Sequence, residues 1–189
     1  LACASAGLVI GVVSLTGLGV RFTQMVIHLS GGVLWLGALL TMIACIILGM
    51  GLPTTAAYII TAVLGVPALT DMGVPLIAAH MFVFYYAVIS TITPPVALAA
   101  YAAAGIADTD PLKTALVGFR VGIAKFVVPF YLIYRPDILL VSADPLKAVY
   151  ALSMSLMGIW ALAASACGYA FRELRIYERL ILFVCIPLT

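Results

Sequence analysis

Charged side chains are scarce in this sequence. Only 8% of the 189 residues are Asp, Glu, Lys or Arg, against about a quarter in ordinary soluble domains. The nine Lys and Arg are dispersed and leave a net charge of +2, so the chain lacks the basic face of a nucleic-acid-binding protein. Hydrophobic residues make up 66% of the chain. A soluble fold cannot bury that much apolar surface, so lipid must be the solvent for much of it.

Catalytic and metal-binding motifs are also missing. The four cysteines are not at metal-ligand spacing and the two histidines lie far apart. The chain contains no HExxH, GxSxG or phosphate-loop motif. Cysteines in apolar segments behave as small hydrophobic residues. We therefore predict that the protein is not an enzyme and has no cofactor.

Apolar runs separated by polar loops predict an all-α integral membrane protein, folded as a multi-span helical bundle. Residues 1–32 read as a membrane helix ending at Arg21 and an interfacial link. Residues 33–104 contain two interrupted elements, and residues 105–189 contain C-terminal spans over 112–134 and 148–171. The last apolar run, Leu180–Thr189, has about half the length that a spanning helix needs. We expect a fragment of a longer membrane protein, cut at both ends.

The first interruption is "LGMGLPTTAAYII", which runs from Leu48 to Ile60. Gly49 and Gly51 permit tight turning, and Pro53 blocks the continuation of a helix. The flanking arms, Val33–Leu48 and Ala56–Val66, are roughly 16–24 Å long at the helical rise. The second arm is expected to end at Pro67, before a surface turn over 69–75. The two arms could form one kinked span or a re-entrant hairpin.

The second interruption is "ISTITPPVALAAY", from Ile89 to Tyr101. Pro94 and Pro95 lack N–H groups and push the preceding residues out of the helical region. We expect unwound backbone over Ser90–Pro95, inside a discontinuous helix that spans 76–104.

Unwound backbone at membrane depth predicts a binding site, because an unpaired peptide group in lipid costs several kcal/mol. The freed carbonyls and hydroxyls form an oxygen cage suited to Na⁺, and the half-helix N-termini suit a carboxylate. We predict that the two breaks face each other. The candidate substrate and ion ligands are Gly49, Gly51, Pro53, Thr54, Thr55, Ser90, Thr91, Thr93, Pro94 and Pro95. Gly49, Thr54, Ser90 and Thr93 are the Na⁺ candidates. The alternative is a non-transporting structural subunit whose helices are merely kinked.

Other polar residues in apolar segments are assigned structural roles. His80 is expected to pack or to lie at the interface, and Tyr58, Tyr85 and Tyr86 to pack. Arg120 and Lys125 lie within a predicted span and can extend to the cytoplasmic surface.

Three stretches resemble the large permease part of tripartite ATP-independent periplasmic (TRAP) transporters. They are "LGMGLPTTAAYI", "AAHMFVFYYAVISTITPPVALAAYAAAGIADTDPLKT" and "PFYLIYRPDILL". The likeness is strongest to the fused 4TM/12TM permeases that work with TAXI-type binding proteins, and it is dense over 48–140. Many members carry an aspartate at the hairpin tip, where this chain has Pro53.

The resemblance implies a fold and a mechanism. The chain would be the second inverted repeat of an elevator-type transporter, with residues 33–66 as a re-entrant helical hairpin and 76–104 as the discontinuous helix. The system would take up an organic acid with Na⁺ as the coupling ion, fed by a periplasmic TAXI-type binding protein. Its other partners would be the lipid bilayer, the remaining permease repeat and the small-subunit region of the full-length chain. The implied location is the bacterial or archaeal inner membrane.

Overall fold

The computed structural model describes residues 2–139 and 145–167, and this part of the chain is helical with no strand. The nine α-helices of the described residues are α1 (Ala2–Thr16), α2 (Leu18–Ser30), α3 (Leu34–Gly49), α4 (Thr54–Asp71), α5 (Leu76–Ile89), α6 (Leu98–Ala107), α7 (Pro111–Val121), α8 (Val128–Tyr134) and α9 (Pro145–Cys167). Three short 3₁₀ segments accompany them: η1 (Ser90–Ile92), η2 (Ile123–Phe126) and η3 (Pro136–Leu139). The all-helical prediction is confirmed for the described residues.

Helices α3 and α4 are antiparallel and pack along their whole length. A Cβ on Gly37, near the start of α3, would meet the Met72 side chain at the end of α4. A Cβ on Gly65 in α4 would lie 3.1 Å from Thr41 and 3.4 Å from Cys45 of α3. Small residues let the two backbones approach closely, as membrane helices require. The two arms that flank the first interruption therefore fold back on one another as a hairpin and do not form one kinked helix.

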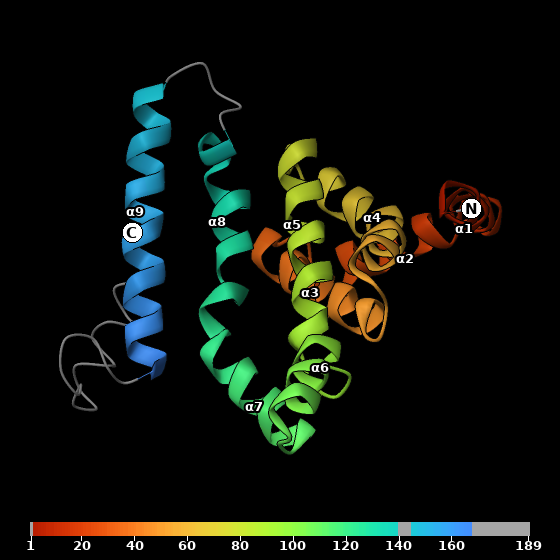
Figure 1. The fold of residues 1–189 in the computed structure, drawn as a ribbon. Coiled ribbons are helices and arrows are strands. Elements are labelled where there is room, and N and C mark those ends of the chain that lie inside the picture. Colours follow the sequence, from red (N-terminus) through yellow and green to blue (C-terminus); the bar gives the residue numbers. More distant parts are fainter. Residues whose placement is uncertain (1, 140–144, 168–189) are drawn as a thin grey trace.

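Helix α5 lies at the centre of the main core, between the hairpin and α8 (Figure 1). Phe82 and Tyr86 on α5 are fully buried, and their rings stack edge to face 4.7 Å apart. Phe130 of α8 packs edge to face on Phe82 at 5.6 Å. This core fixes where α5 ends, and so it fixes the position of the second interruption.

The N-terminal helix differs from the prediction. Gly17 adopts a left-handed conformation, with φ of 65°, and ends α1 before the expected boundary at Arg21. Helix α2 then runs through the predicted link, bent by 65° from α1. The segment Leu18–Ser30 is amphipathic, so it forms a helix that packs one face on α4. A residue other than glycine at position 17 would be strained in the left-handed conformation of the bend. Gly7 and Gly11, which have GxxxG spacing, have no side chain or backbone of the described residues packed at their Cβ positions.

Helix α4 passes through Pro67, where the sequence predicted its end. It continues to Asp71, with Leu69 fully buried, so the predicted surface turn over 69–75 is wrong for its first half. Packing of Leu69 in the main core outweighs the one backbone hydrogen bond that Pro67 removes. The Thr70 hydroxyl also bonds to the carbonyls of Val66 and Pro67.

The predicted span over 112–134 is broken. Helix α7 stops at Val121, η2 follows, and α8 begins at Val128. Gly122 and Pro129 stand at the two sides of this break. After η3, helix α9 begins at Pro145, inside the predicted loop, and it corresponds to the predicted span over 148–171. The final apolar run, 180–189, lies outside the described residues.

Few helices of the described residues are both long enough and apolar enough to cross a membrane. Among the described residues, α4 is long and apolar enough to cross a membrane, and the bent pair α1–α2 passes the same test if it counts as one span. A core helix of a soluble protein would pass this test too. Large apolar side chains nevertheless cover the outside of α1, α7 and α9, among them Leu15 at 90% and Val121 at 66% exposure. An aqueous monomer rarely exposes so much apolar surface.

Candidate functional site

The first break is a four-residue turn between α3 and α4. Met50 is extended, Gly51 has φ of +76°, and Pro53 precedes the first residue of α4. The positive φ is one that glycine adopts without strain. Leu52 N–H donates to the Gly49 carbonyl at 3.3 Å. The carbonyls of Met50, Gly51 and Leu52 accept no hydrogen bond from the described residues.

The second break is longer than predicted. Residues 90–92 form a 3₁₀ turn, and the non-helical backbone then extends to Ala97 instead of ending at Pro95. The Pro94–Pro95 bond is cis, and the Tyr101 hydroxyl donates to the Pro95 carbonyl. The backbone carbonyls of residues 91–94 accept no hydrogen bond from the described residues.

The two breaks meet, as predicted. Ser90 Oγ lies 3.1 Å from the Gly49 carbonyl oxygen and 2.7 Å from that of Ala87. A Cβ on Gly49 would lie only 2.6 Å from Ser90 Oγ, so glycine is needed at this crossing. Gly51 approaches the second break as well, since its Cβ position is 3.4 Å from the Val96 side chain.

The hydroxyls at the second break are buried and oriented by their own helix. Ser90 is fully buried, and Thr93 is 8% exposed with Oγ1 donating to the Ile89 carbonyl at 2.9 Å. Thr91 is less buried and donates to Val88 at 2.7 Å. A hydroxyl that donates its proton to a carbonyl keeps two lone pairs. These oxygens can therefore act as neutral ligands for a hard cation.

The predicted residues of the first break are more open. Gly51, Pro53, Thr54 and Thr55 are exposed, while Gly49 is buried against Ser90. The hydroxyls of Thr54 and Thr55 form no hydrogen bond with the described residues. Helix α4 also has no side-chain cap, so the N–H groups of its first turn are available. Of the four predicted Na⁺ ligands, Gly49 and Ser90 are joined directly by a hydrogen bond, and Thr54 and Thr93 are not part of it.

A third break, which the sequence reading missed, adjoins the second. A Cβ on Gly122 would lie 3.4 Å from Cδ1 of Ile92. The Tyr86 hydroxyl donates to the Phe126 carbonyl at 2.5 Å, and this bond ties η2 to α5. The signals were Gly118 and Gly122 four residues apart, with a proline soon after. Three interrupted segments therefore gather around one end of α5.

The histidine and tyrosines of this region are structural. His80 Nδ1 and the Tyr58 hydroxyl are 2.8 Å apart and link α5 to α4. Tyr86 is fully buried in the aromatic core. Both observations agree with the packing roles expected from the sequence. Arg120 and Lys125 are exposed.

Carboxylates are absent from both predicted breaks. Residues 48–55 and 89–97 contain no Asp or Glu. Among the described residues, no group of three or more His, Cys, Asp or Glu side chains could hold a metal ion. The donors that the breaks offer are neutral backbone and hydroxyl oxygens.

Comparison with known proteins gives one match. A family model, "DctM: Tripartite ATP-independent periplasmic transporter, DctM component", matches residues 1–146. No curated protein and no solved structure matches the chain at a significant level. The matched residues include both predicted breaks, α1 to α8 and the start of α9.

Proposed function

The chain belongs to the DctM family of tripartite ATP-independent periplasmic transporters, and from that premise we propose that the junction of its two breaks is the binding site of a Na⁺-coupled solute permease. The family is one of integral inner-membrane transporter components and not of enzymes. The family also implies a periplasmic binding protein as partner. Sodium coupling, the TAXI class of that partner and the fused 4TM/12TM architecture are part of the proposal.

The observation that carries the proposal is the contact of Ser90 Oγ with the Gly49 carbonyl at 3.1 Å. It brings together two unwound segments that are 41 residues apart in the sequence. Each segment presents carbonyls that no described residue satisfies. In a membrane such groups must be satisfied by protein, water or a ligand.

Neutral oxygen ligands favour Na⁺ over a proton as the coupling ion. A proton carrier must titrate, and neither break contains a carboxylate or histidine. A hard monovalent cation needs no titrating group and can be bound by several neutral oxygen ligands in a confined space. The buried hydroxyls of Ser90 and Thr93 and the carbonyls of residues 91–94 supply that kind of ligand.

The start of α4 suits an organic acid. Its first-turn N–H groups have no side-chain cap, and the adjacent Thr54 and Thr55 hydroxyls are exposed and unpaired with the described residues. The positive end of the helix dipole favours a carboxylate at that position. In the proposed elevator mechanism the hairpin and the discontinuous helix move together as the transport half, and a cation and an anion would be held side by side at its tip.

The test uses the full-length permease that contains this chain. Its thermal unfolding is measured in NaCl and in KCl of equal ionic strength, and Na⁺ binding is then titrated for variants. We expect a higher midpoint in NaCl, because a ligand that binds only the folded state stabilises it. Thr93→Val and Ser90→Ala should raise the half-saturating Na⁺ concentration by about tenfold, which corresponds to about 1.4 kcal/mol for a lost oxygen ligand.

Thr16→Val is the matched control. Its hydroxyl also donates within its own helix, to Val12 at 2.8 Å, but it lies on α1 away from the breaks. The control should bind Na⁺ like the parent. Equal midpoints in NaCl and KCl, or equal Na⁺ titrations in all three variants, would reject the sodium site and favour kinked helices of purely structural use.

A further inference from the structure

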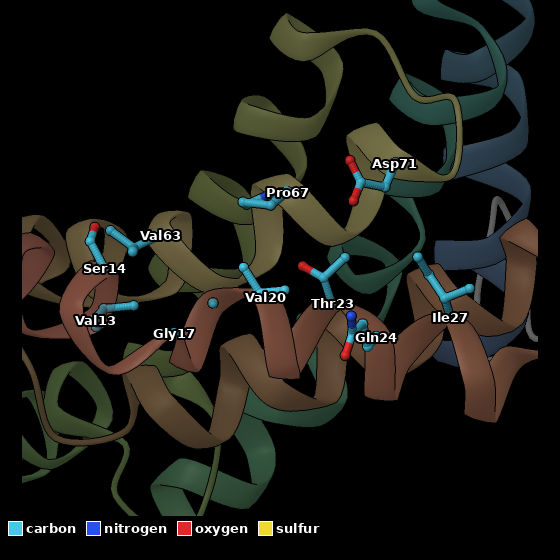
Figure 2. Close-up of a pocket in the computed structure, with 11 residues that line it drawn as sticks. Val13, Ser14, Gly17, Val20, Thr23, Gln24, Ile27, Val63, Pro67 and Asp71 are labelled. Atoms are coloured by element: carbon cyan, nitrogen blue, oxygen red, sulfur yellow. The ribbon is translucent and has the colours of Figure 1, made fainter.

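A cavity lies between α2 and α4, with the end of α1 at one side (Figure 2). Its volume is about 440 Å³, within the range of small-molecule pockets. It includes Asp71, at the far end of α4 from Thr54. The 18 residues of α4 place these ends about 25 Å apart, so the cavity is separate from the breaks.

Thr23 gives this cavity an unsatisfied polar group. The residue is 5% exposed, and its Oγ1 is the one buried side-chain oxygen or nitrogen of the described residues without a hydrogen-bond partner. Figure 2 shows the side chain directed from α2 toward α4. Other helical hydroxyls donate to the carbonyl four residues earlier, as in Thr16, Thr41, Thr61, Thr70 and Ser155. Thr23 does not, and a buried hydroxyl without a partner is unfavourable.

A backbone acceptor faces the same cavity. Pro67 has no N–H, so the Val63 carbonyl loses the donor that an α-helix would provide. This carbonyl points at α2, where a Cβ on Gly19 would lie 3.5 Å from its oxygen. Val63, Pro67 and Gly19 all line the cavity.

Asp71 gives the cavity a negative charge. Its side chain is exposed and makes no ion pair or hydrogen bond with the described residues. Gln24 and Ser14 add further polar groups, and no Lys, Arg or His lines the cavity. Arg21, although it also lies on α2, borders a different cavity together with Ile47 and Leu64.

We propose that this cavity binds a small molecule through a protonated primary amine. The carboxylate of Asp71 and the hydroxyl of Thr23 can accept hydrogen bonds from the ammonium group, and only the carboxylate carries charge. The Val63 carbonyl lies eight residues, about 12 Å, from Asp71 along α4, so it would accept from another polar group of the same ligand. An ammonium group supplies three donors and the opposite charge. An anion would be repelled by Asp71, and a wholly apolar ligand would leave Thr23 unpaired. The amine is either free in solution or the head group of phosphatidylethanolamine.

The experiment follows ligand-induced stabilisation of the full-length permease, so it does not depend on transport. Ethanolamine is titrated while the thermal unfolding midpoint is measured, with ethylene glycol as the uncharged probe of similar size. In a second arm the permease is placed in nanodiscs of phosphatidylethanolamine or of phosphatidylcholine. Phosphatidylcholine is the control, because its quaternary ammonium head group has no N–H donor. Saturable stabilisation by ethanolamine alone indicates a free amine, and stabilisation only by phosphatidylethanolamine indicates the lipid.

Two variants test the assignment of residues. Asp71→Asn should weaken the stabilising ligand about tenfold or more, because a charge-assisted bond becomes a neutral one. Asp108→Asn, a surface carboxylate on the C-cap of α6, is the control and should behave like the parent. Thr23→Val should leave the midpoint without ligand unchanged or raised, and should reduce the shift that the ligand produces.

Three results would overturn the proposal. They are stabilisation by neither ethanolamine nor phosphatidylethanolamine, an equal response of Asp71→Asn and Asp108→Asn, and equal stabilisation by ethylene glycol. None of these results bears on Na⁺ binding at the breaks, because α4 carries the two sites at opposite ends.

Discussion

Replacing Gly49 by alanine is the most direct perturbation of the junction between the two breaks. The new Cβ would lie 2.6 Å from Ser90 Oγ and 3.0 Å from Ser90 Cβ. Real Cβ atoms essentially never approach a heavy atom to 2.6 Å, and 3.0 Å is tighter than most real Cβ contacts. Ser90 is fully buried, so its side chain cannot move aside into solvent and the two segments must separate.

The expected cost follows from two terms. Overpacking of a well-packed site costs about 1–3 kcal/mol. The Ser90 hydroxyl shares its one proton between the carbonyls of Gly49 and Ala87, so losing the Gly49 share adds at most about 1 kcal/mol. Alanine recovers up to about 1 kcal/mol through its helix propensity, so Gly49→Ala should destabilise the full-length permease by about 1–3 kcal/mol. Gly105→Ala is the matched control. Its Cβ position on α6 is empty, so it should be neutral or slightly stabilising.

A double-mutant series separates this contact from a general intolerance of alanine. In a Ser90→Ala background the Oγ contact disappears but the 3.0 Å approach of the two Cβ atoms remains. In a Ser90→Gly background both contacts disappear. The cost of Gly49→Ala should therefore fall in steps from parent to Ser90→Ala to Ser90→Gly, measured by equilibrium unfolding in mixed micelles. An equal cost in all three backgrounds would refute the geometry of the junction.

Two further contacts make smaller predictions. Asp110→Ala should destabilise α7 by about 0.5–2 kcal/mol, because Asp110 caps the helix by accepting from Lys113 N–H at 2.8 Å; Asp110→Asn should retain most of the stability, and equal losses in both variants would contradict the capping role. Tyr58→Phe should cost about 1 kcal/mol, because the hydroxyl pairs with His80 Nδ1 at 2.8 Å. The same substitution made in a His80→Phe protein should cost clearly less, and an undiminished cost would show that the hydrogen bond is not the source.

The sequence anticipated the features that depend on local chemistry. Proline and glycine have the same backbone consequences wherever they occur, so the break at Gly49–Pro53 and the break at Pro94–Pro95 could both be located from residue type. The facing of the breaks also followed, since unpaired peptide groups in an apolar environment need partners. What residue type left open was whether the two arms were antiparallel, because that depends on contacts such as Gly65 with Thr41.

The features that the sequence reading missed depend on tertiary packing. Pro67 looked like a helix end, but burial of Leu69 carries α4 past it. Gly17 looked like one more glycine in an apolar run, yet it bends the chain by 65° between α1 and α2. The break after Gly122 lay inside an apolar pattern that a continuous helix would fit equally well. In each case a single glycine or proline is compatible with either a continuous or an interrupted helix. Contacts with residues distant in the sequence determine which of the two forms.

The second break also separates two packed groups of residues. Upstream, α5 packs on α3, α4 and α8 in the main core. Downstream, α6 packs mainly on α7 through a small cluster of Ala97, Ala100 and Ala115. Two stretches of chain join the groups: the non-helical residues 93–97 before α6, and the break between α7 and α8. A rearrangement that moved one group against the other, as distinct from the elevator movement of hairpin and discontinuous helix together, would concentrate its dihedral changes in these two stretches. Elsewhere it would break helical hydrogen bonds.

This placement gives a physical reason for an ion to control such movement. Two of the unsatisfied carbonyls, those of Thr93 and Pro94, belong to the linking backbone before α6, and those of Thr91 and Ile92 directly precede it. A cation bound to several of them would fix their relative orientation, while an empty site would leave this to hydrogen bonds such as those of the Ser90, Thr93 and Tyr101 hydroxyls. Occupancy would thus bias the equilibrium between two arrangements by its differential affinity for them. The coupling would arise in the linking backbone itself and would need no titrating side chain.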